Sequence, residues 1–219
     1  SDRAWVAGPP QALFARRLGY RQIETGLYCA DVEAYRCDRP LDARAPAFLF
    51  TGRLVADKGF DLLIEAYRRY RQQVPLPLAL DVAGVGPLAV LAEGQPGVRT
   101  RGFVQACDLP TLMADSQALV LPSRLENWGV VIQEAAVAGL PVLASRVCGA
   151  ASTYVRDGES GFVFAPTVPG ILDALLAFHA QSSVQRQAMS LKSQKLGLIL
   201  TPALQVQRFE SLVLQDNPF

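Results

Sequence analysis

The segment SRLENWGVVIQEAAVAGLPVLAS, residues Ser123 to Ser145, is apolar almost throughout and yet carries two glutamates, Glu126 and Glu134. Glu134 lies in a run from Val130 to Leu143 in which Gln133 is the one other polar residue. A helix this apolar must be covered on nearly all sides. The segment therefore predicts a buried helix in an α/β domain, with a carboxylate that needs a partner.

The Glu134 carboxylate has two candidate partners. Burying an ionised carboxylate without hydrogen bonds costs on the order of several kcal/mol. An internal cation could satisfy it, and so could a ligand, because adjacent hydroxyls such as those of a ribose can both donate to one carboxylate. Glu126 precedes the helix, in the loop after LVLPS, where a strand end delivers it to a ligand crevice. The two glutamates together favour the ligand.

Short β-type runs alternate with helical patterns from residue 47 onward. The predicted strands are residues 47–50, 78–83, 98–103, 117–123 and 141–145, and the predicted helices between them are residues 59–73, 87–93, 108–116 and 129–139. After GFVF, residues 161–164, helical patterns continue to the end of the chain. This alternation predicts an α/β fold, a Rossmann-like parallel sheet with helices on both faces and a helical C-terminal tail.

A polar, proline-bearing segment, RCDRPLDARAP, divides the chain at residues 36–46. We interpret it as a linker. Residues 1–35 then form one further unit with strand and helix patterns, and residues 47–219 form the main domain with its C-terminal helices.

The composition limits the functional class. A net charge of +1 over 219 residues gives no basis for nucleic acid binding. The four cysteines form no CxxC pair and the chain has one histidine, His179, so a zinc site is not expected. No signal peptide and no run of about 18 apolar residues is present, so free thiols in a cytoplasmic protein are expected.

The loop TGRLVADKG, residues 51–59, follows a predicted strand and opens a predicted helix. Gly52 permits a tight turn, and Arg53 and Lys58 place two cations near the helix start. Arginine can grip a phosphate with two parallel hydrogen bonds, lysine adds a compact charge, and free backbone N–H groups add more. The loop suits a diphosphate, although a surface turn with two solvated cations would show the same pattern.

Other functions are compatible with parts of the sequence. AGVGPLAVL, residues 83–91, matches a relaxed G-x-G-x-x-A fingerprint with Asp108 downstream, as in a NAD-type oxidoreductase domain. Pro87 within the turn, and the place of Asp108 as a helix N-cap, favour a plain pair of turn glycines instead.

As a glycoside hydrolase pair, the two glutamates would lie about 12 Å apart in a continuous helix, beyond the usual ~5–9.5 Å. A non-catalytic α/β nucleotide-binding module also stays open.

Two further features concern phosphate chemistry. No Asp-x-Asp motif occurs, so a metal ion bound by paired aspartates is not expected. The protein's own cations and helix ends would then stabilise the negative charge on the leaving group. Gly149, followed by small residues, suits close approach of backbone N–H groups to an anion at a helix start.

Four motifs, in this order, resemble those of the C-terminal, nucleotide-sugar-binding half of a GT-B glycosyltransferase, in the large family 4 of retaining enzymes. They are TGRLVADKGFDLLIEA, DVAGVGPL, GFVQACDLPTLMADSQALVLPS and ENWGVVIQEAAVAGLPV, within residues 48–164, and the last looks like the family's E-x7-E motif. The resemblance implies a nucleotide diphosphate sugar donor linked to UDP, GDP or ADP. It also implies retaining transfer to an acceptor, with neither metal nor cofactor.

The resemblance implies roles for individual residues. Arg53 and Lys58 would hold the diphosphate and, with Glu126 beside the donor sugar, form the catalytic group. Glu134 would accept hydrogen bonds from the ribose hydroxyls. The full set of implied donor-binding residues is Gly52, Arg53, Lys58, Phe103, Val104, Glu126, Asn127, Trp128, Gly129 and Glu134, with Gly52 admitting the phosphates and Phe103 and Val104 lining the base pocket.

The chain departs from the family pattern in two ways. Gly149-Ala150 stands where a Gly-Gly pair is usual, and Thr153 stands where a glutamate is usual. Residues 1–35 could supply only the end of the acceptor-side N-terminal domain, so we expect that domain to be missing and sugar transfer by this chain alone to be poor. The last predicted helix, residues 202–215, would cross back toward it. The resemblance also allows peripheral association with the inner face of a membrane.

Overall fold

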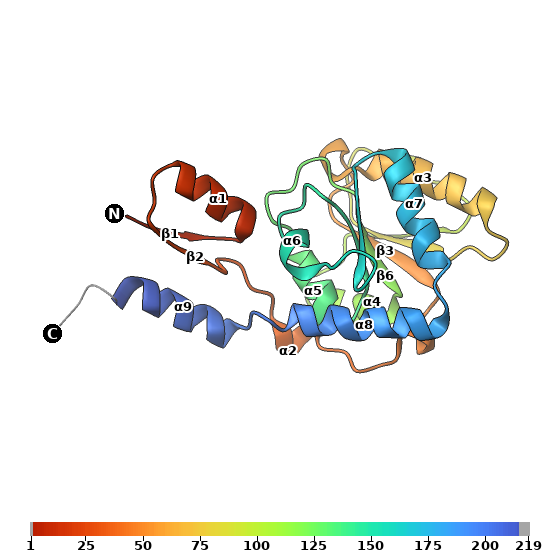
Figure 1. The fold of residues 1–219 in the computed structure, drawn as a ribbon. Helices are drawn as coiled ribbons and strands as arrows, with labels where there is room; N and C mark the ends of the chain where they lie inside the picture. Colours follow the sequence, from red (N-terminus) through yellow and green to blue (C-terminus); the bar gives the residue numbers. More distant parts are fainter. Residues whose placement is uncertain (1, 215–219) are drawn as a thin grey trace.

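The structure is a computed structural model that describes residues 2–214, as a larger α/β domain and a smaller N-terminal unit (Figure 1). The larger domain contains one six-stranded sheet in the order β5-β4-β3-β6-β7-β8, and every neighbouring pair is parallel. Its strands are β3 (Ala47–Thr51), β4 (Ala79–Ala83), β5 (Val98–Gly102), β6 (Ala118–Leu121), β7 (Val142–Ser145) and β8 (Gly161–Phe164). The predicted Rossmann-like sheet is confirmed.

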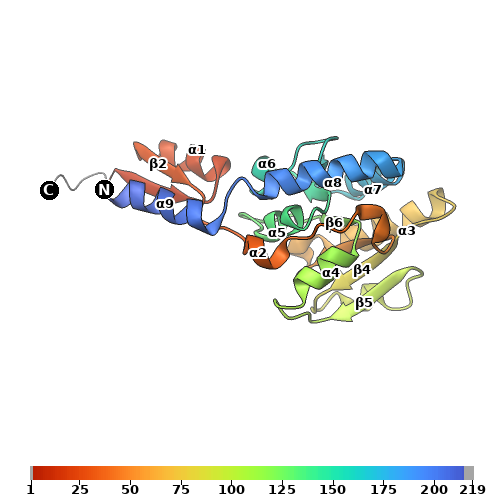
Figure 2. The ribbon, with the colours of Figure 1, turned by 90° about the horizontal axis from the view of Figure 1, so that it is seen from below.

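Helices cover both faces of this sheet. One face carries α3 (Phe60–Gln73) and α7 (Val168–His179), and the other carries α4 (Leu109–Asp115), α5 (Val131–Val137) and the short α6 (Ala151–Tyr154), with α8 (Ser183–Gly197) packed on α5 (Figures 1 and 2). Successive strand residues point to opposite faces, so Phe48 and Phe50 pack toward α3 and α7, whereas Leu49 packs toward α5. Because both faces are covered, the central strands β3, β6 and β7 are buried and largely apolar runs, whereas the edge strand β5 carries two arginines and is largely exposed.

The strand order reverses between β3 and β6. From β3 the chain moves outward to β4 and β5, and it then returns to the other side of β3 as β6. In open α/β sheets the loops diverge at such a point and leave a crevice outside the carboxyl ends of the strands. The loops after β3 and β6 therefore border the crevice, and they carry Arg53, Lys58 and Glu126.

Some local predictions differ from the structure. Residues 87–93, predicted as a helix, form only the 3-10 helix η3 (Ala89–Ala92), because Pro87 precedes it and Gly94 adopts a left-handed φ of 64° just after it. Asp108 does precede α4, but its side chain makes no capping hydrogen bond. Within the predicted linker, the 3-10 helix η1 (Leu41–Ala43) holds a buried Leu41.

The N-terminal unit consists of the parallel pair β1 (Arg3–Val6) and β2 (Gln22–Thr25) with α1 (Pro9–Arg17) between them in sequence. Helix α9 (Pro202–Leu214) lies along this unit (Figure 2), where the ring centroids of Trp5 and Phe209 are 5.0 Å apart. The last helix thus crosses back to the N-terminal unit, and Phe209 stays about half exposed. Residue 215, which we included in this helix, lies outside the described residues, as do residues 1 and 216–219. Whether residues 1–35 belong to an acceptor-side domain stays a prediction.

Two backbone segments cross between the unit and the larger domain, and Gln133 in α5 binds both. Its amide oxygen accepts from Ala30 N–H at 2.8 Å, and its amide nitrogen donates to the carbonyls of Gly197 at 3.1 Å and Leu200 at 2.8 Å. Gln133 is fully buried. An unpaired buried backbone group costs free energy comparable to a lost hydrogen bond, so one side chain here satisfies three. None of the helices among residues 2–214 is long and apolar enough to traverse a bilayer.

Replacing Gln133 by alanine should destabilise the protein by about 3 kcal/mol, since Ala30 N–H and two carbonyls would lose their partner in a dry site. Urea unfolding followed by circular dichroism measures this free energy. Gln207→Ala is the matched control, because Gln207 is exposed on α9, and its effect should stay within about 0.5 kcal/mol. Equal unfolding midpoints for the two variants would contradict the assigned role of Gln133.

Candidate functional site

A cavity of about 470 Å³ lies at the carboxyl edge of the sheet, at the point where the strand order reverses. Thr51 and Gly52 line it from the end of β3, and Leu121 lines it from the end of β6. The remaining lining residues come from α5, its preceding loop, and three other segments: Tyr28, Lys58, Leu109, Glu126, Asn127, Trp128, Gly129, Val130, Val131 and Glu134.

A second cavity of about 250 Å³ shares Thr51 and Gly52 with the first. Arg53, Phe103 and Val104 line it, and Phe103 is 68% exposed at its edge. The two cavities therefore form one cleft with a polar part at α5 and an apolar part after β5. All ten residues that the sequence predicted for the site line one cavity or the other. Their placement agrees with the prediction, and their roles stay proposals.

Glycines bring the loops of the cleft close together. A Cβ atom at Gly84 would lie 1.9 Å from the carbonyl oxygen of Gly52, and one at Gly86 would lie 2.5 Å from that of Leu54. The glycine pair after β4 therefore packs on the loop after β3. Only a four-residue 3-10 helix follows it, so the helix N-terminus that a dinucleotide fingerprint requires is not present in residues 83–97. This geometry disfavours the NAD-type alternative.

Glu134 lies in the first turn of α5 and faces the larger cavity. Burial raises the pKa of its carboxyl, and a hydrogen bond from the Tyr35 hydroxyl partly offsets that effect. Within residues 2–214, no lysine or arginine forms an ion pair with Glu134. Burial likewise raises the pKa of Tyr35, and the charge of Glu134 adds to it, so Tyr35 stays a neutral donor. The internal-cation alternative for Glu134 is wrong.

Glu126 does have an internal cation. Lys58 Nζ lies 2.5 Å from Glu126 Oε2, and the two side chains are 21% and 16% exposed. A low-exposure pair of this kind is held more firmly than a surface pair. The fold thus brings together Lys58 from the loop after β3 and Glu126 from the loop after β6, and the ion pair holds both side chains in the wall of the cleft.

Arg53 differs from Lys58 in its surroundings. Its side chain is exposed at the smaller cavity, and no residue of the described chain forms an ion pair or side-chain hydrogen bond with it. A guanidinium in this state is available to an anion in the cleft.

Sequence reasoning missed two contributors. Tyr35 is the hydroxyl donor to Glu134, and Tyr28 lines the larger cavity. Both precede the main domain in sequence, in a stretch interpreted only as the end of a separate unit. Tyr35 directly precedes the charged segment interpreted as a linker, and nothing in the sequence around it indicated that its hydroxyl contacts Glu134.

Gly149, by contrast, has a packing role in this structure. A Cβ atom there would lie 2.5 Å from the carbonyl oxygen of Asn127 and 3.0 Å from the Trp128 ring. The helix that follows, α6, has only four residues. Close approach of protein groups is therefore sufficient to explain this glycine.

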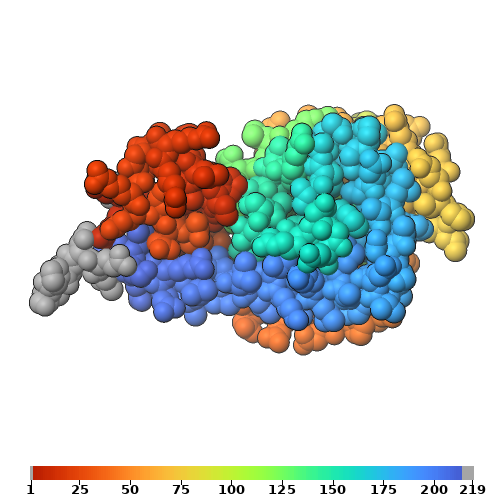
Figure 3. Space-filling view, viewed as in Figure 1, coloured from red at the N-terminus to blue at the C-terminus, as the bar shows by residue number. Residues whose placement is uncertain are grey.

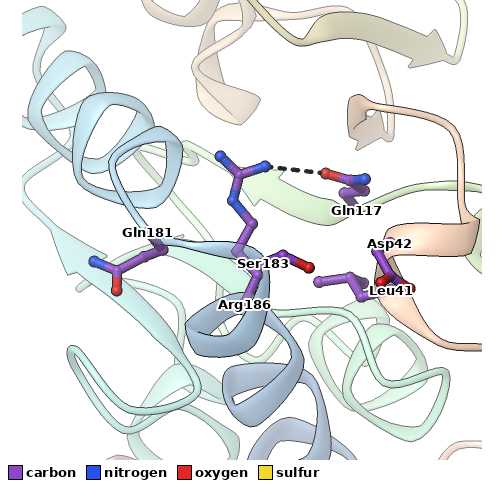
Figure 4. Close-up of a pocket in the computed structure, with 6 residues that line it drawn as sticks. All are labelled: Leu41, Asp42, Gln117, Gln181, Ser183 and Arg186. Carbon is purple, nitrogen blue, oxygen red and sulfur yellow. Dashed lines mark hydrogen bonds between the residues drawn. The ribbon is translucent and has the colours of Figure 1, made fainter.

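Another cavity, of about 270 Å³, lies at the opposite, amino-terminal edge of the sheet (Figure 4). Its basic residue Arg186 donates to His179 O at 2.6 Å and to Gln117 Oε1 at 3.3 Å, and its guanidinium lies 5.0 Å from the Phe178 ring centroid. Arg186 thus joins α8 to the end of α7. His179 in turn meets the Tyr70 hydroxyl at 2.7 Å, so its predicted structural role agrees with its contacts.

Known proteins resemble this chain in sequence and in fold. The family described as "Glycosyl transferases group 1" matches residues 45–181, which is more than half of the chain. Alpha-D-kanosaminyltransferase from Streptomyces kanamyceticus is 33% identical over 158 residues, covering 67% of this chain and 40% of that protein. The chain thus spans less than half the length of this curated relative.

Solved structures agree at the level of fold. The pneumococcal O-GlcNAc transferase GtfA, in complex with UDP and GlcNAc, superposes with a TM-score of 0.78 at 17% identity, over 96% of this chain and 44% of that chain. The C-terminal domain of the group 1 family protein LpcC from Francisella tularensis gives 0.65 at 20% identity, over 76% of this chain and 95% of that domain. With the family match over residues 45–181, these findings show that the chain belongs to the group 1 glycosyl transferases, with a GT-B-like fold.

Proposed function

We propose that this chain is the donor-binding domain of a retaining, metal-independent glycosyltransferase of family 4. It binds a nucleotide diphosphate sugar and presents it to an acceptor held by a further domain. The observation that carries the proposal is the cleft at the strand reversal. There Glu134, which has no cation partner in the described chain, lines the same cavity as Lys58 and Glu126. Arg53 lines the adjoining cavity, and Gly52 borders both.

The nucleoside end of the donor lies against Glu134 in the larger cavity and against Phe103 and Val104 in the smaller one. The ribose hydroxyls donate to the Glu134 carboxylate, which otherwise has the Tyr35 hydroxyl alone. The base lies against Phe103 and Val104, where an exposed aromatic ring offers a stacking surface. Nothing in this apolar wall selects one base, so UDP, GDP and ADP are all candidates.

The diphosphate and the sugar occupy the wall between Arg53 and Glu126. As the bond from the anomeric carbon to the leaving oxygen breaks, negative charge grows on the β-phosphate. Preorganised cations such as Arg53 and Lys58 stabilise that charge more in the transition state than in the ground state. Glu126, held by Lys58, lies beside the donor sugar, with Asn127, Trp128 and Gly129 completing that end.

Activity and location of the whole protein are also proposals. The chain spans 40% of Alpha-D-kanosaminyltransferase, one of the curated relatives, and we expect sugar transfer by this chain alone to be poor. Residence in the cytoplasm, with peripheral contact to the inner membrane face, stays a prediction. A non-catalytic nucleotide-binding module would bind the same ligands but would not transfer sugar when the chain is joined to an acceptor domain.

Calorimetric titration with UDP, GDP and ADP, each with and without Mg²⁺, tests donor binding. We expect one of them to bind without Mg²⁺, and Glu134→Ala and Arg53→Ala each to weaken it by about tenfold or more. Arg69→Ala is the matched control, since Arg69 is an exposed arginine on α3 paired with Glu65. Tight NAD binding, or binding by none of the three nucleotides, would overturn the proposal.

The stability of Glu134→Gln should depend on pH in a defined direction. Burial raises the pKa of Glu134 above its usual 4.5, so the folded wild type bears no penalty below that value and a growing one as pH rises through the raised pKa. The glutamine variant should therefore match the wild type near pH 4 and be more stable at pH 7, while binding the nucleotide more weakly. Urea unfolding at both pH values measures this, and a less stable variant at pH 7 would refute it.

A further inference from the structure

The N-terminal unit contacts the wall of the cleft at two neighbouring residues, Asn127 and Trp128, and the larger contact is with the Trp128 ring. This side chain is 4% exposed, and it lies edge-on to Tyr154 with ring centroids 6.2 Å apart. Figure 3 shows the N-terminal unit (red) meeting the larger domain (green and teal) below a notch at the top of the view. Trp128 is therefore a wall of the proposed donor site and also part of the boundary between the two units.

Two glycines form a slot for the Trp128 ring. A Cβ atom at Gly8, in the N-terminal unit, would lie 2.2 Å from Cη2 and 2.3 Å from Cζ3 of the ring. A Cβ atom at Gly149, in the larger domain, would lie 3.0 Å from Cε3. Gly8 has an extended φ of −172°, which any residue adopts, so the ring and not the backbone excludes a side chain there. The indole thus fits between the two units with no room to spare.

A hydrogen bond beside the slot joins the same two units. Gln11 in α1 donates from Nε2 to the backbone carbonyl of Asn127 at 2.6 Å. On the other side, Ala150 N–H donates to the carbonyl of Trp128 at 2.9 Å. The segment from Glu126 to Gly129 has no helix or strand of its own, so these contacts and the Lys58–Glu126 pair determine its path.

We propose that Gly8 and Gln11 are positioning residues, through which the N-terminal unit holds residues 126–129 in the geometry that the donor sugar requires. This inference rests on the proposed function. It adds that docking of the N-terminal unit acts on the sugar end of the cleft, at Glu126, and not on the nucleoside end, at Glu134. The two ends are separable because α5 begins at Val131, between them, and Gln133 anchors that helix through Ala30, Gly197 and Leu200, not through Gly8 or Gln11.

Gly8→Ala tests the slot in the full chain. Nucleoside diphosphates and their hexose conjugates serve as probes: UDP with UDP-glucose, GDP with GDP-mannose, and ADP with ADP-glucose. In the variant, affinity for the nucleoside diphosphate should stay within about twofold, whereas affinity for the conjugate should fall by about tenfold, as overpacking displaces Trp128. Adding Trp128→Phe to Gly8→Ala should restore part of the loss, because the shorter ring vacates the slot.

Gly19→Ala is the matched control for general damage to the N-terminal unit. Gly19 has a φ of 94°, so alanine strains the unit, but a Cβ atom there has nothing within 4 Å. Gln11→Glu is the second variant, since it opposes a carboxylate oxygen to the Asn127 carbonyl without adding bulk. It should reproduce the selective loss of hexose-conjugate affinity. An equal effect from Gly19→Ala, or equal losses for both kinds of probe, would overturn the inference.

Amide hydrogen exchange of the free protein decides the question without a ligand. In Gly8→Ala, amides of residues 126–130 and the Ala150 amide should exchange about tenfold faster, while amides of β3 and β4 keep their wild-type rates. Unchanged exchange at Ala150 would refute the slot, even if the nucleotides bind. If no nucleotide binds the wild type, the proposed function fails, and faster exchange at residues 126–130 would still establish the coupling of the two units.

Discussion

A carboxylate in apolar surroundings needs hydrogen-bond donors, and this constraint determines how the cleft is understood. Glu134 sits on a helix whose other faces are buried against the sheet and α8, and the Tyr35 hydroxyl is the donor that the described protein offers its side chain. Burial raises the pKa of its carboxyl, because few groups stabilise the charged form there. A ligand with paired hydroxyls would add such groups, and the cations that a diphosphate needs lie along the same walls. The buried carboxylate thus lowers the stability of the free protein and favours ligand binding, a trade-off that is common at functional sites.

The neighbouring residue gives α5 its second role. Gln133 and Glu134 are adjacent, so their side chains leave the helix in different directions, about 100° apart. One binds the two backbone segments that pass between the N-terminal unit and the larger domain, and the other faces the cleft. The helix thus fixes the crossing and the proposed ribose contact on one rigid element. The segment just before it, residues 126–129, has no helix or strand of its own, and the N-terminal unit contacts the site there.

The sequence was sufficient for five of the six strands, and the central ones are short apolar runs with turn residues at their ends, as in Ala47–Thr51 and Val142–Ser145, whereas β8 was not among the predicted strands. The ten site residues came from the family resemblance together with charged groups and glycines at strand ends, and all ten line the cleft because parallel strands bring those ends to one edge, whereas their roles stay proposals. The sequence could not reveal the pair Lys58–Glu126, whose members are 68 residues apart. Nor could it reveal why Gly8 is glycine, since the reason is a Trp128 ring from another unit. The prediction of a helix at residues 87–93 was wrong because Pro87 and Gly94 limit the segment to the four residues of a 3-10 helix.

The most direct test of the central claim is the pKa of Glu134, measured by NMR on protein with ¹³C-labelled glutamate side chains. The titration is run on the free protein and on protein saturated with the nucleoside diphosphate that binds, in its ribo and 2′,3′-dideoxy forms. If ribose hydroxyls complete the solvation of the carboxylate, the ribonucleotide will lower the pKa of Glu134 and the dideoxynucleotide will not. A pKa that is the same in the free protein and in both complexes would contradict the account.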